Sequence, residues 1–237
     1  MSPRPYRMEK RRIAASETRQ RILEAARELL TEHVAPDLSM DAIARRADVA
    51  RLTIYYQFKS RRGLLEALYD HLAMRGNMQR MAEVFQTADA SHALELLVRT
   101  FVGFWSSDPI VMRRLRAMAA LDVDIEKGIE ARDARRQHAA RQILGRMAAG
   151  RELKKDAPPA AARADVLSAL TSFEMYDALN KAGHPPEEIV AVISHLARSA
   201  IETYSKGSAE APAINSPTGA RKSECRPPNA RRRRRLR

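Results

Sequence analysis

Apolar side chains recur at intervals of three and four residues along most of this chain, and this spacing constrains the fold more than any other feature. Ile22, Leu23, Ala26, Leu29 and Leu30, for example, fall on one face of a helix. We find no alternating pattern typical of a strand and no internal repeat. Alanine, leucine, arginine and glutamate are frequent, and only 9 of 237 residues are glycine, so the composition also favours helix. The sequence therefore predicts an all-α fold.

Capping residues, prolines and one glycine divide the periodic pattern into about nine helices. Ser16 or Thr18 caps a first helix, two short helices follow, and Ser60 caps a longer fourth helix. The remaining helices are expected at about 91–106, 109–121, 125–149, 161–181 and 186–204.

The net charge of +13 is concentrated near the two ends of the chain. Residues 206–237 carry ten Lys/Arg against two Glu, and residues 1–20 carry six against two. Such an excess suggests a polyanionic partner, although charge runs are also commonly just solvated. Residues 206–237 are rich in Pro, Ser and Arg without periodicity, and we expect them to be disordered.

Cysteine usage and hydropathy indicate the cellular compartment of the protein. The single cysteine, Cys225, excludes an internal disulfide. We recognise neither a signal peptide nor an apolar run of the length of a membrane helix. We therefore expect a cytoplasmic protein in a reducing compartment.

Enzyme motifs are missing from the sequence. No histidine pair has metalloprotease spacing, and neither a phosphate-binding glycine loop nor a nucleophile elbow appears. Asp122, Asp124 and Glu126 could hold a cation, but acidic residues are also favoured at the start of a helix. We expect no enzymatic activity, no cofactor and no metal site.

Residues 39–57 contain two short helices separated by a three-residue break, which is the geometry of a helix-turn-helix. Asp48 lies in the break, where aspartate tolerates the left-handed conformation better than most residues. The second helix would present Arg51, Leu52 and Thr53 to a major groove. Arginine reads guanine through two hydrogen bonds, and leucine and threonine meet thymine methyl groups.

Polar and aromatic side chains around this second helix are placed to contact phosphates, which fixes the register of a protein on DNA. The amino end of the first short helix offers a further phosphate site. Tyr55 could instead be core, and Lys59 merely a surface lysine. The expected DNA-binding residues are Ser39, Arg51, Leu52, Thr53, Tyr55, Tyr56, Gln57, Lys59 and Arg61.

The segments "TRQRILEAARELL" and "LSMDAIARRADVARLTIYYQFKSRRGLLEAL" together resemble the DNA-binding domain of the tetracycline-repressor (TetR) family. The resemblance covers about residues 16–72. Three positions depart from the family pattern: Asp48 replaces the usual turn glycine, Ala50 replaces a capping Ser or Thr, and Leu52 replaces a commonly small residue.

The resemblance implies a homodimeric transcriptional repressor that reads a palindromic operator and releases DNA when a small effector binds. The implied organisation is a basic N-terminal arm, a helix-turn-helix domain, a helical ligand-binding and dimerisation domain, and a disordered basic tail. Their expected bounds are 1–15, 16–74, 75–205 and 206–237.

The C-terminal half contains clustered aromatic and methionine residues, which would suit a cavity for an apolar effector. A hydrogen bond from Tyr176 or Trp105 would orient that effector. These residues could equally be the ordinary core of a helical bundle. The candidate ligand-binding residues are Phe101, Phe104, Trp105, Met112, Met118, Phe173 and Tyr176.

The last two predicted helices, about 161–181 and 186–204, resemble the dimerisation helices of the family. The residues expected in the interface are Ala161, Leu167, Leu170, Phe173, Ile189, Val192, Ile193, Leu196 and Ala200. A rival hypothesis is a nonspecific nucleic-acid-binding protein driven by the basic tails, which would depend strongly on salt without preferring a sequence.

Overall fold

The structure is a computed structural model, and it describes residues 3–32, 38–149 and 159–206. Those residues form α-helices and one 3-10 helix, with no strand among them, so the all-α prediction is confirmed. Of the predicted disordered tail, 206–237, Lys206 ends a helix, and residues 207–237, with Cys225, lie outside the described residues.

Helices α1 to α4 form the N-terminal domain, with bounds α1 Pro3–Leu29, α2 Met40–Arg46, α3 Arg51–Phe58 and α4 Arg61–Arg75. Helix α1 supplies Ile22, and the turn that follows it supplies Leu30, to a core that Ile43, Ile54 and Leu68 complete; all five are almost fully buried. This shared core explains why such short helices are stable, since helices of this length rarely form in isolation.

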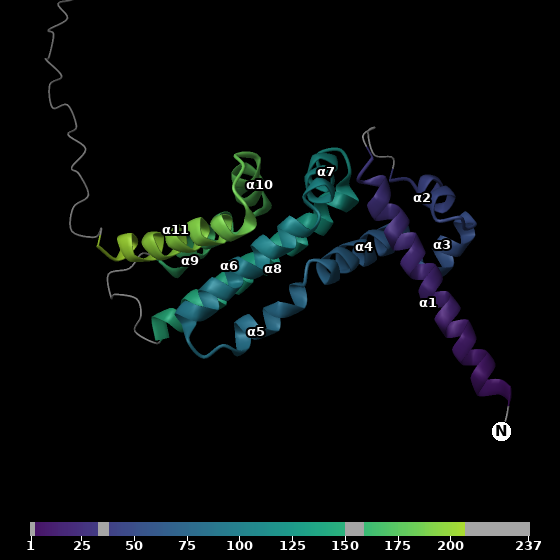
Figure 1. Cartoon of the computed structure of the whole chain (residues 1–237), viewed down its shortest axis with the longest axis horizontal. Coiled ribbons are helices and arrows are strands. Elements are labelled where there is room, and N and C mark those ends of the chain that lie inside the picture. Colours follow the sequence, from purple (N-terminus) through teal and green to yellow (C-terminus); the bar gives the residue numbers. More distant parts are fainter. Residues whose placement is uncertain (1–2, 33–37, 150–158, 207–237) are drawn as a thin grey trace, which may run out of the picture.

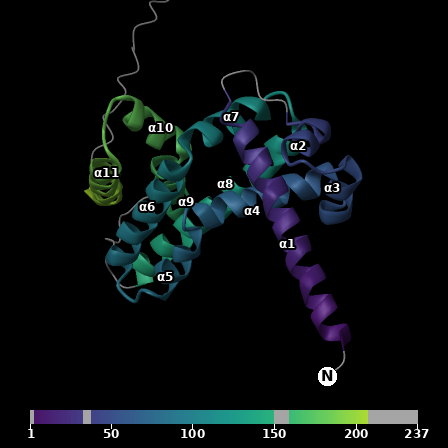
Figure 2. The same ribbon diagram turned by 45° about the vertical axis from the view of Figure 1, so that its right-hand side comes forward.

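Helix α1 begins at Pro3, so the predicted start at Ser16 or Thr18 is wrong. Its first turns carry polar residues that favour helix. They show no apolar periodicity, so no pattern indicated that the helix extends this far. From Met8 to Glu17 every residue is exposed. Figures 1 and 2 show this part of α1 projecting away from the rest of the molecule.

The C-terminal helices are η1 Met78–Arg80, α5 Met81–Gln86, α6 Ala90–Ser107, α7 Pro109–Ala119, α8 Val123–Ala149, α9 Ala160–Leu170, α10 Phe173–Lys181 and α11 Pro186–Lys206. Helices α6 and α8 run side by side through the centre, with α1 to α3 at one end and α9 to α11 at the other (Figure 1).

Two differences raise the helix count above the predicted nine. Helix α5 fills a region without predicted structure, and the helix predicted at 161–181 is broken into α9 and α10. The break has a local cause: the Ser172 hydroxyl accepts a hydrogen bond from the Met175 amide at 3.2 Å and caps α10. Gly183, at φ +93°, follows the end of α10, as predicted.

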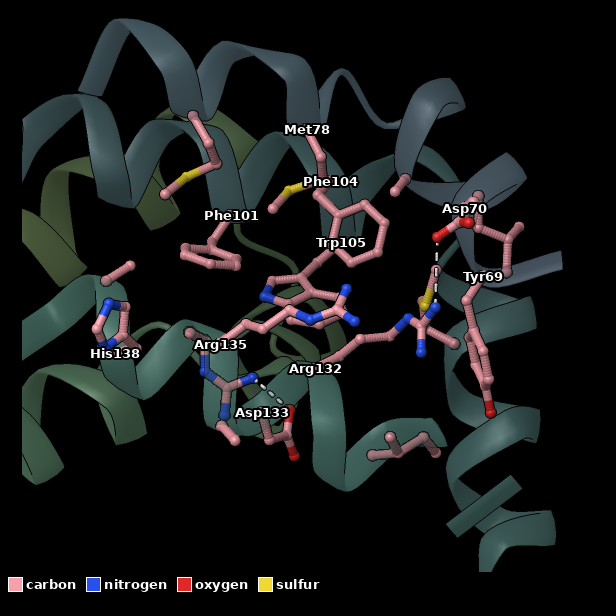
Figure 3. Close-up of a pocket in the computed structure, with 18 of the residues that line it drawn as sticks. Tyr69, Asp70, Met78, Phe101, Phe104, Trp105, Arg132, Asp133, Arg135 and His138 are labelled. Carbon is pink, nitrogen blue, oxygen red and sulfur yellow. Dashed lines mark hydrogen bonds and ion pairs between the residues drawn. The ribbon is translucent and has the colours of Figure 1, made fainter. Parts of the chain in front are cut away.

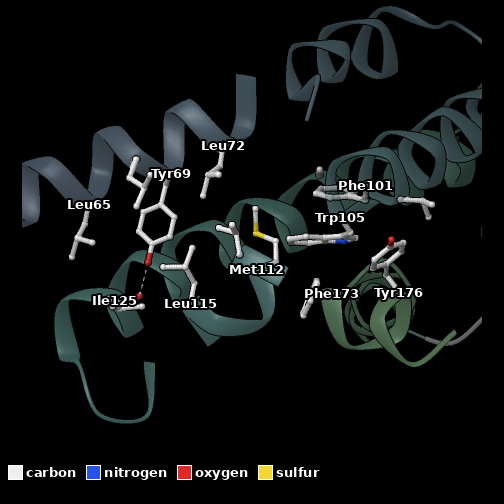
Figure 4. Close-up of a cluster of buried hydrophobic side chains, with 14 of the residues drawn as sticks. Leu65, Tyr69, Leu72, Phe101, Trp105, Met112, Leu115, Ile125, Phe173 and Tyr176 are labelled. Atoms are coloured by element: carbon white, nitrogen blue, oxygen red, sulfur yellow. Dashed lines mark hydrogen bonds between the residues drawn. The ribbon is translucent and has the colours of Figure 1, made fainter. Parts of the chain in front are cut away.

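An apolar core joins the two ends of the molecule. Figure 4 shows it running from Tyr69 and Leu72 on α4, past Leu115 on α7, to Trp105 and Phe173. Helix α4 therefore packs both on the N-terminal helices and on the C-terminal bundle.

Candidate nucleic-acid interface and ligand cavity

The turn between α2 and α3 has the predicted geometry. Asp48 adopts φ +50°, in the left-handed region, and the Val49 amide donates to the Ala44 carbonyl at 3.1 Å. The first turn of α3 lacks a side-chain cap, because Ala50 has no acceptor to offer. The Ser39 hydroxyl caps α2 by accepting from the Ala42 amide at 3.2 Å.

Helix α3 turns its hydrophobic side chains in two directions. Ile54 and Phe58 are buried against the other helices, whereas Leu52 and Tyr56 are 61% and 71% exposed. Thr53 is half-buried. An exposed leucine and tyrosine on one short helix, beside an exposed arginine, form a surface with both apolar and cationic groups.

Arg51 is held by two partners, the exposed Asp41 and the half-buried Tyr55. One of its Nη atoms lies 3.0 Å from an Asp41 carboxylate oxygen, and the other lies 3.4 Å from the Tyr55 hydroxyl. Tyr55 itself is half-buried and packs against the core, so it supports Arg51 from the inside of α3. Both readings of Tyr55, as core and as part of the surface, therefore describe part of its role.

Gln57 and Lys59 lie at the carboxyl end of α3. The Gln57 amide nitrogen donates to the Ala15 carbonyl at 3.2 Å and so ties α3 to α1. Lys59, exposed and at φ +68°, ends the helix and donates from Nζ to the Tyr56 carbonyl at 3.3 Å.

Arg61, at the start of α4, pairs with two carboxylates of the C-terminal half. Its guanidinium contacts Asp122 at 3.2 Å, in the segment that joins α7 to α8, and Asp124 at 3.4 Å, in the first turn of α8. It therefore connects the two halves of the chain. These two carboxylates, which the sequence offered as a possible cation site, serve as partners of this arginine.

A cavity of about 620 Å³ lies in the C-terminal part. It is lined from α4, η1, α5, α6, α7 and α8. Of the predicted ligand residues, Phe101, Phe104, Trp105 and Met112 line it, and Met118, Phe173 and Tyr176 do not.

The predicted hydrogen bond from Trp105 or Tyr176 to an effector does not fit this cavity. The Trp105 indole N–H donates to the Thr171 carbonyl at 3.0 Å, inside the break between α9 and α10. Tyr176 is buried behind Phe173, with ring centroids 6.3 Å apart. Phe173 packs edge-on against Trp105 and supports the cavity wall from behind.

Arginines form the polar side of the cavity, which the sequence analysis missed. Arg132 donates to Glu66 at 3.1 Å and Asp70 at 3.4 Å, both on α4, and its guanidinium lies 4.1 Å from the Tyr69 ring centroid. Tyr69 donates its hydroxyl proton to the Ile125 carbonyl at 3.1 Å, and burial raises its pKa to about 12.

The described residues contain no group of side chains suited to bind a metal ion. No helix in residues 3–32, 38–149 or 159–206 has the length and apolar character needed to cross a membrane.

Residues 22–68 match the family model described as "Bacterial regulatory proteins, tetR family". Over 61 residues the chain is 46% identical to the uncharacterized HTH-type transcriptional regulator TtgW of Pseudomonas putida, which is 26% of this chain and 43% of that protein. The TetR-like regulator LfrR of Mycobacterium smegmatis, solved with proflavine, is 27% identical with a TM-score of 0.51, over 79% of this chain and 98% of that one. Residues 22–68 of this chain therefore form a TetR-family helix-turn-helix region.

TetR proteins are transcriptional regulators rather than enzymes, which agrees with the sequence prediction. The chain spans less than half the length of the curated relatives that it matches. Among solved structures, a regulator from Saccharomonospora viridis in complex with choline shares the fold, with 22% identity and a TM-score of 0.61 over 78% of this chain and 98% of that one. The TetR fold thus extends across both halves of the described chain.

Proposed function

We propose that this chain is a sequence-specific transcriptional repressor that acts in the cytoplasm as a homodimer on a palindromic operator and releases DNA when a small effector binds. The observation that carries the proposal is the outer face of α3, where Leu52 and Tyr56 are exposed beside Arg51 in a TetR helix-turn-helix. Exposed apolar groups of this kind mark interaction surfaces.

The contacts follow from side-chain chemistry. Arg51 would read guanine, and Leu52 and Thr53 would meet methyl groups in the major groove. Tyr56 and Lys59 would contact phosphates, and residues 38–63 carry six Lys/Arg against two Asp, which favours DNA independently of the tails. We assign Arg61 no DNA contact, because Asp122 and Asp124 hold it elsewhere.

The proposed dimer interface is the outer face of α9 and α11. Of the residues predicted there, Leu167, Leu170, Phe173, Ile189 and Ile193 are buried within the chain itself. Val192 and Leu196, one turn apart on α11, remain partly exposed and are available to a second copy. A two-fold dimer would place its recognition helices about 34 Å apart, or a multiple of that distance, and so read a palindrome.

The effector would occupy the cavity that α4 helps to line. LfrR was solved with proflavine, which supports binding of a small ligand by a protein of this fold. An effector that favours a wrong spacing of the recognition helices by about 1–3 kcal/mol would weaken DNA binding by about 5- to 150-fold.

The deciding experiment is a selection of genomic fragments by the purified full-length protein in about 150 mM salt, near physiological ionic strength. We expect enrichment of one palindrome. A version ending at Lys206 should enrich the same palindrome if α3 chooses the site. Failure of both proteins to enrich any sequence would reject the proposal.

The basic tail favours a second function, nonspecific nucleic-acid binding, since residues 206–237 carry ten Lys/Arg against two Glu. This function predicts affinity without sequence preference and a steep dependence on salt. Removing residues 207–237 should then lower the salt dependence and leave the choice of operator unchanged. An unchanged dependence would reject a role for the tail.

A further inference from the structure

The cavity has two chemically different sides. Phe101, Phe104 and Met78 lie along one side, and Arg132, Asp133 and Arg135 lie along the other (Figure 3). The first side comes from α6 and η1, and the second comes from a single stretch of α8. A purely apolar ligand would fit the first side and leave the second without a partner.

The carboxylates at the polar side are already shared among arginines. Asp133 accepts from Arg136 at 2.7 Å and from Arg116 at 3.2 Å, and Glu174 lies 2.9 Å from Arg116. Asp70, the other acidic residue in the lining, pairs with Arg132. The lining therefore contains two aspartates and four arginines, an excess of positive charge.

Two donor groups in this lining, the Arg136 Nε–H and the Arg135 guanidinium, have no acceptor within the described residues. Arg136 is only 8% exposed, and its Nε atom is buried without a hydrogen-bond acceptor. Arg135 is exposed, and it makes no ion pair or hydrogen bond within the described part of the chain. A guanidinium stays protonated in proteins, so the missing partner must be an acceptor, and an anion is the best one.

We propose that the effector is an amphipathic anion, whose apolar body lies between Phe101, Phe104 and Met78 and whose carboxylate lies against Arg135 and Arg136. The inference rests on the proposed ligand-binding role of this cavity and names its ligand class. The excess of arginine disfavours a cation, because like charges in a partly desolvated site repel. This sets the chain apart from a relative that holds proflavine or choline.

A series of three ligands that share one alkyl chain tests the charge directly. Decanoate, decanol and decyltrimethylammonium differ only in the head group, and Trp105, the only tryptophan of the chain, lines the cavity and reports binding by its fluorescence. We expect the full-length protein to bind decanoate about tenfold or more tightly than decanol, as befits charge-assisted hydrogen bonds. Decanol binding as tightly as decanoate, or tighter binding of the ammonium, would overturn the proposal.

Variants on one helix locate the head group. Arg135→Gln should reduce the preference for decanoate over decanol to near unity, as should Arg136→Gln if that variant folds. Arg141→Gln is the matched control, because Arg141 is an exposed arginine of α8 that does not line the cavity. Equal head-group preference in Arg135→Gln and Arg141→Gln would place the anion elsewhere and contradict the assignment.

Release of the operator is measured separately. Selective binding of decanoate without release would support the anion site and reject the effector part of the proposed function. Release by decanol and decyltrimethylammonium, but not by decanoate, would overturn the anion site and leave the proposed function standing.

Discussion

Arginine serves opposite purposes on α3 and on α8. On α3, Arg51 is more than half exposed, and its partners Asp41 and Tyr55 lie at the surface. On α8, Arg136 is almost fully buried and shares the Asp133 carboxylate with Arg116. An exposed ion pair contributes little to stability, whereas breaking a buried pair is costly. The surface arginine can therefore exchange its partner at little cost in stability, and the buried one is part of the fold.

The largest expected effect tests the buried Arg136 on α8. Asp133→Asn keeps the shape of the side chain but removes the charge that Arg116 and Arg136 share. We expect the free energy of unfolding to fall by about 2–4 kcal/mol in urea titrations, because Arg136 is left with an uncompensated charge. Operator affinity per folded molecule should not change. A loss of stability below about 0.5 kcal/mol would show that the pair is not structural.

At the exposed Arg51 on α3 we expect the reverse: a loss of operator affinity without a loss of stability. Arg51→Ala should weaken operator binding by about tenfold to a hundredfold, the range of one good arginine–guanine contact. Its melting temperature should match that of the wild type, since Arg51 packs on no core residue other than Tyr55. Arg62→Ala, an exposed arginine outside α3, provides the control and should bind normally. Equal effects of the two variants would mean that Arg51 supplies only general charge.

A pair of glycines tests how closely the cavity wall packs on α4. Both lie in α8, but a methyl group at Gly128 would collide with the Tyr69 ring, whereas one at Gly145 would meet no atom within 4 Å. Gly128→Ala should therefore destabilise the protein by about 1–3 kcal/mol, and Gly145→Ala should stabilise it by about 0.5–1 kcal/mol. Thermal unfolding of both variants measures the difference. Stabilisation by both would show that α4 and α8 are more loosely packed.

The smallest expected effect concerns the stability of the folded protein at low pH. A hydrogen bond from Arg113, helped by Lys181, lowers the pKa of Asp177 below its ordinary value. Because the pKa of Asp177 is lowered in the folded state, its ionised carboxylate stabilises the protein at pH values above the ordinary aspartate range. This stabilisation is lost as the pH falls below about 4. Asp177→Asn should be less stable than the wild type at neutral pH and should lose less stability on acidification. Parallel pH profiles for both proteins would contradict this linkage.

The N-terminal domain could largely be predicted from sequence because its signals are local. The Ser60 cap, the left-handed Asp48 and the stripe of α1 each depend on residues within a few positions. The polar side of the cavity could not be predicted in this way. Arg132, Arg135 and Arg136 have the spacing of one helix face, but a charged face usually faces solvent, and only the packing of α8 against α4 and α6 turns it inward.

Long-range contacts explain the other differences. Arg61 follows α3 directly, which led to its prediction as a DNA contact, and its carboxylate partners lie 61 and 63 residues further along the chain, beyond the reach of any local signal. Several predicted interface residues of α9 to α11 are buried in the chain's own core. Apolar periodicity predicts that a side chain is buried, but it does not show whether the covering surface belongs to the same chain or to a second copy.

Helix α4 belongs to both halves of the chain, and this limits how the protein can be re-engineered. The expected boundary after residue 74 cuts α4 next to Leu72 and Ala73, which line the cavity, and separates Arg132 from Glu66 and Asp70. A chimera joined there would take its helix-turn-helix and the α4 wall of the cavity from one parent and the rest of the cavity from the other. Biosensors built from this protein should therefore exchange α2 and α3 alone and keep α4 with its native bundle.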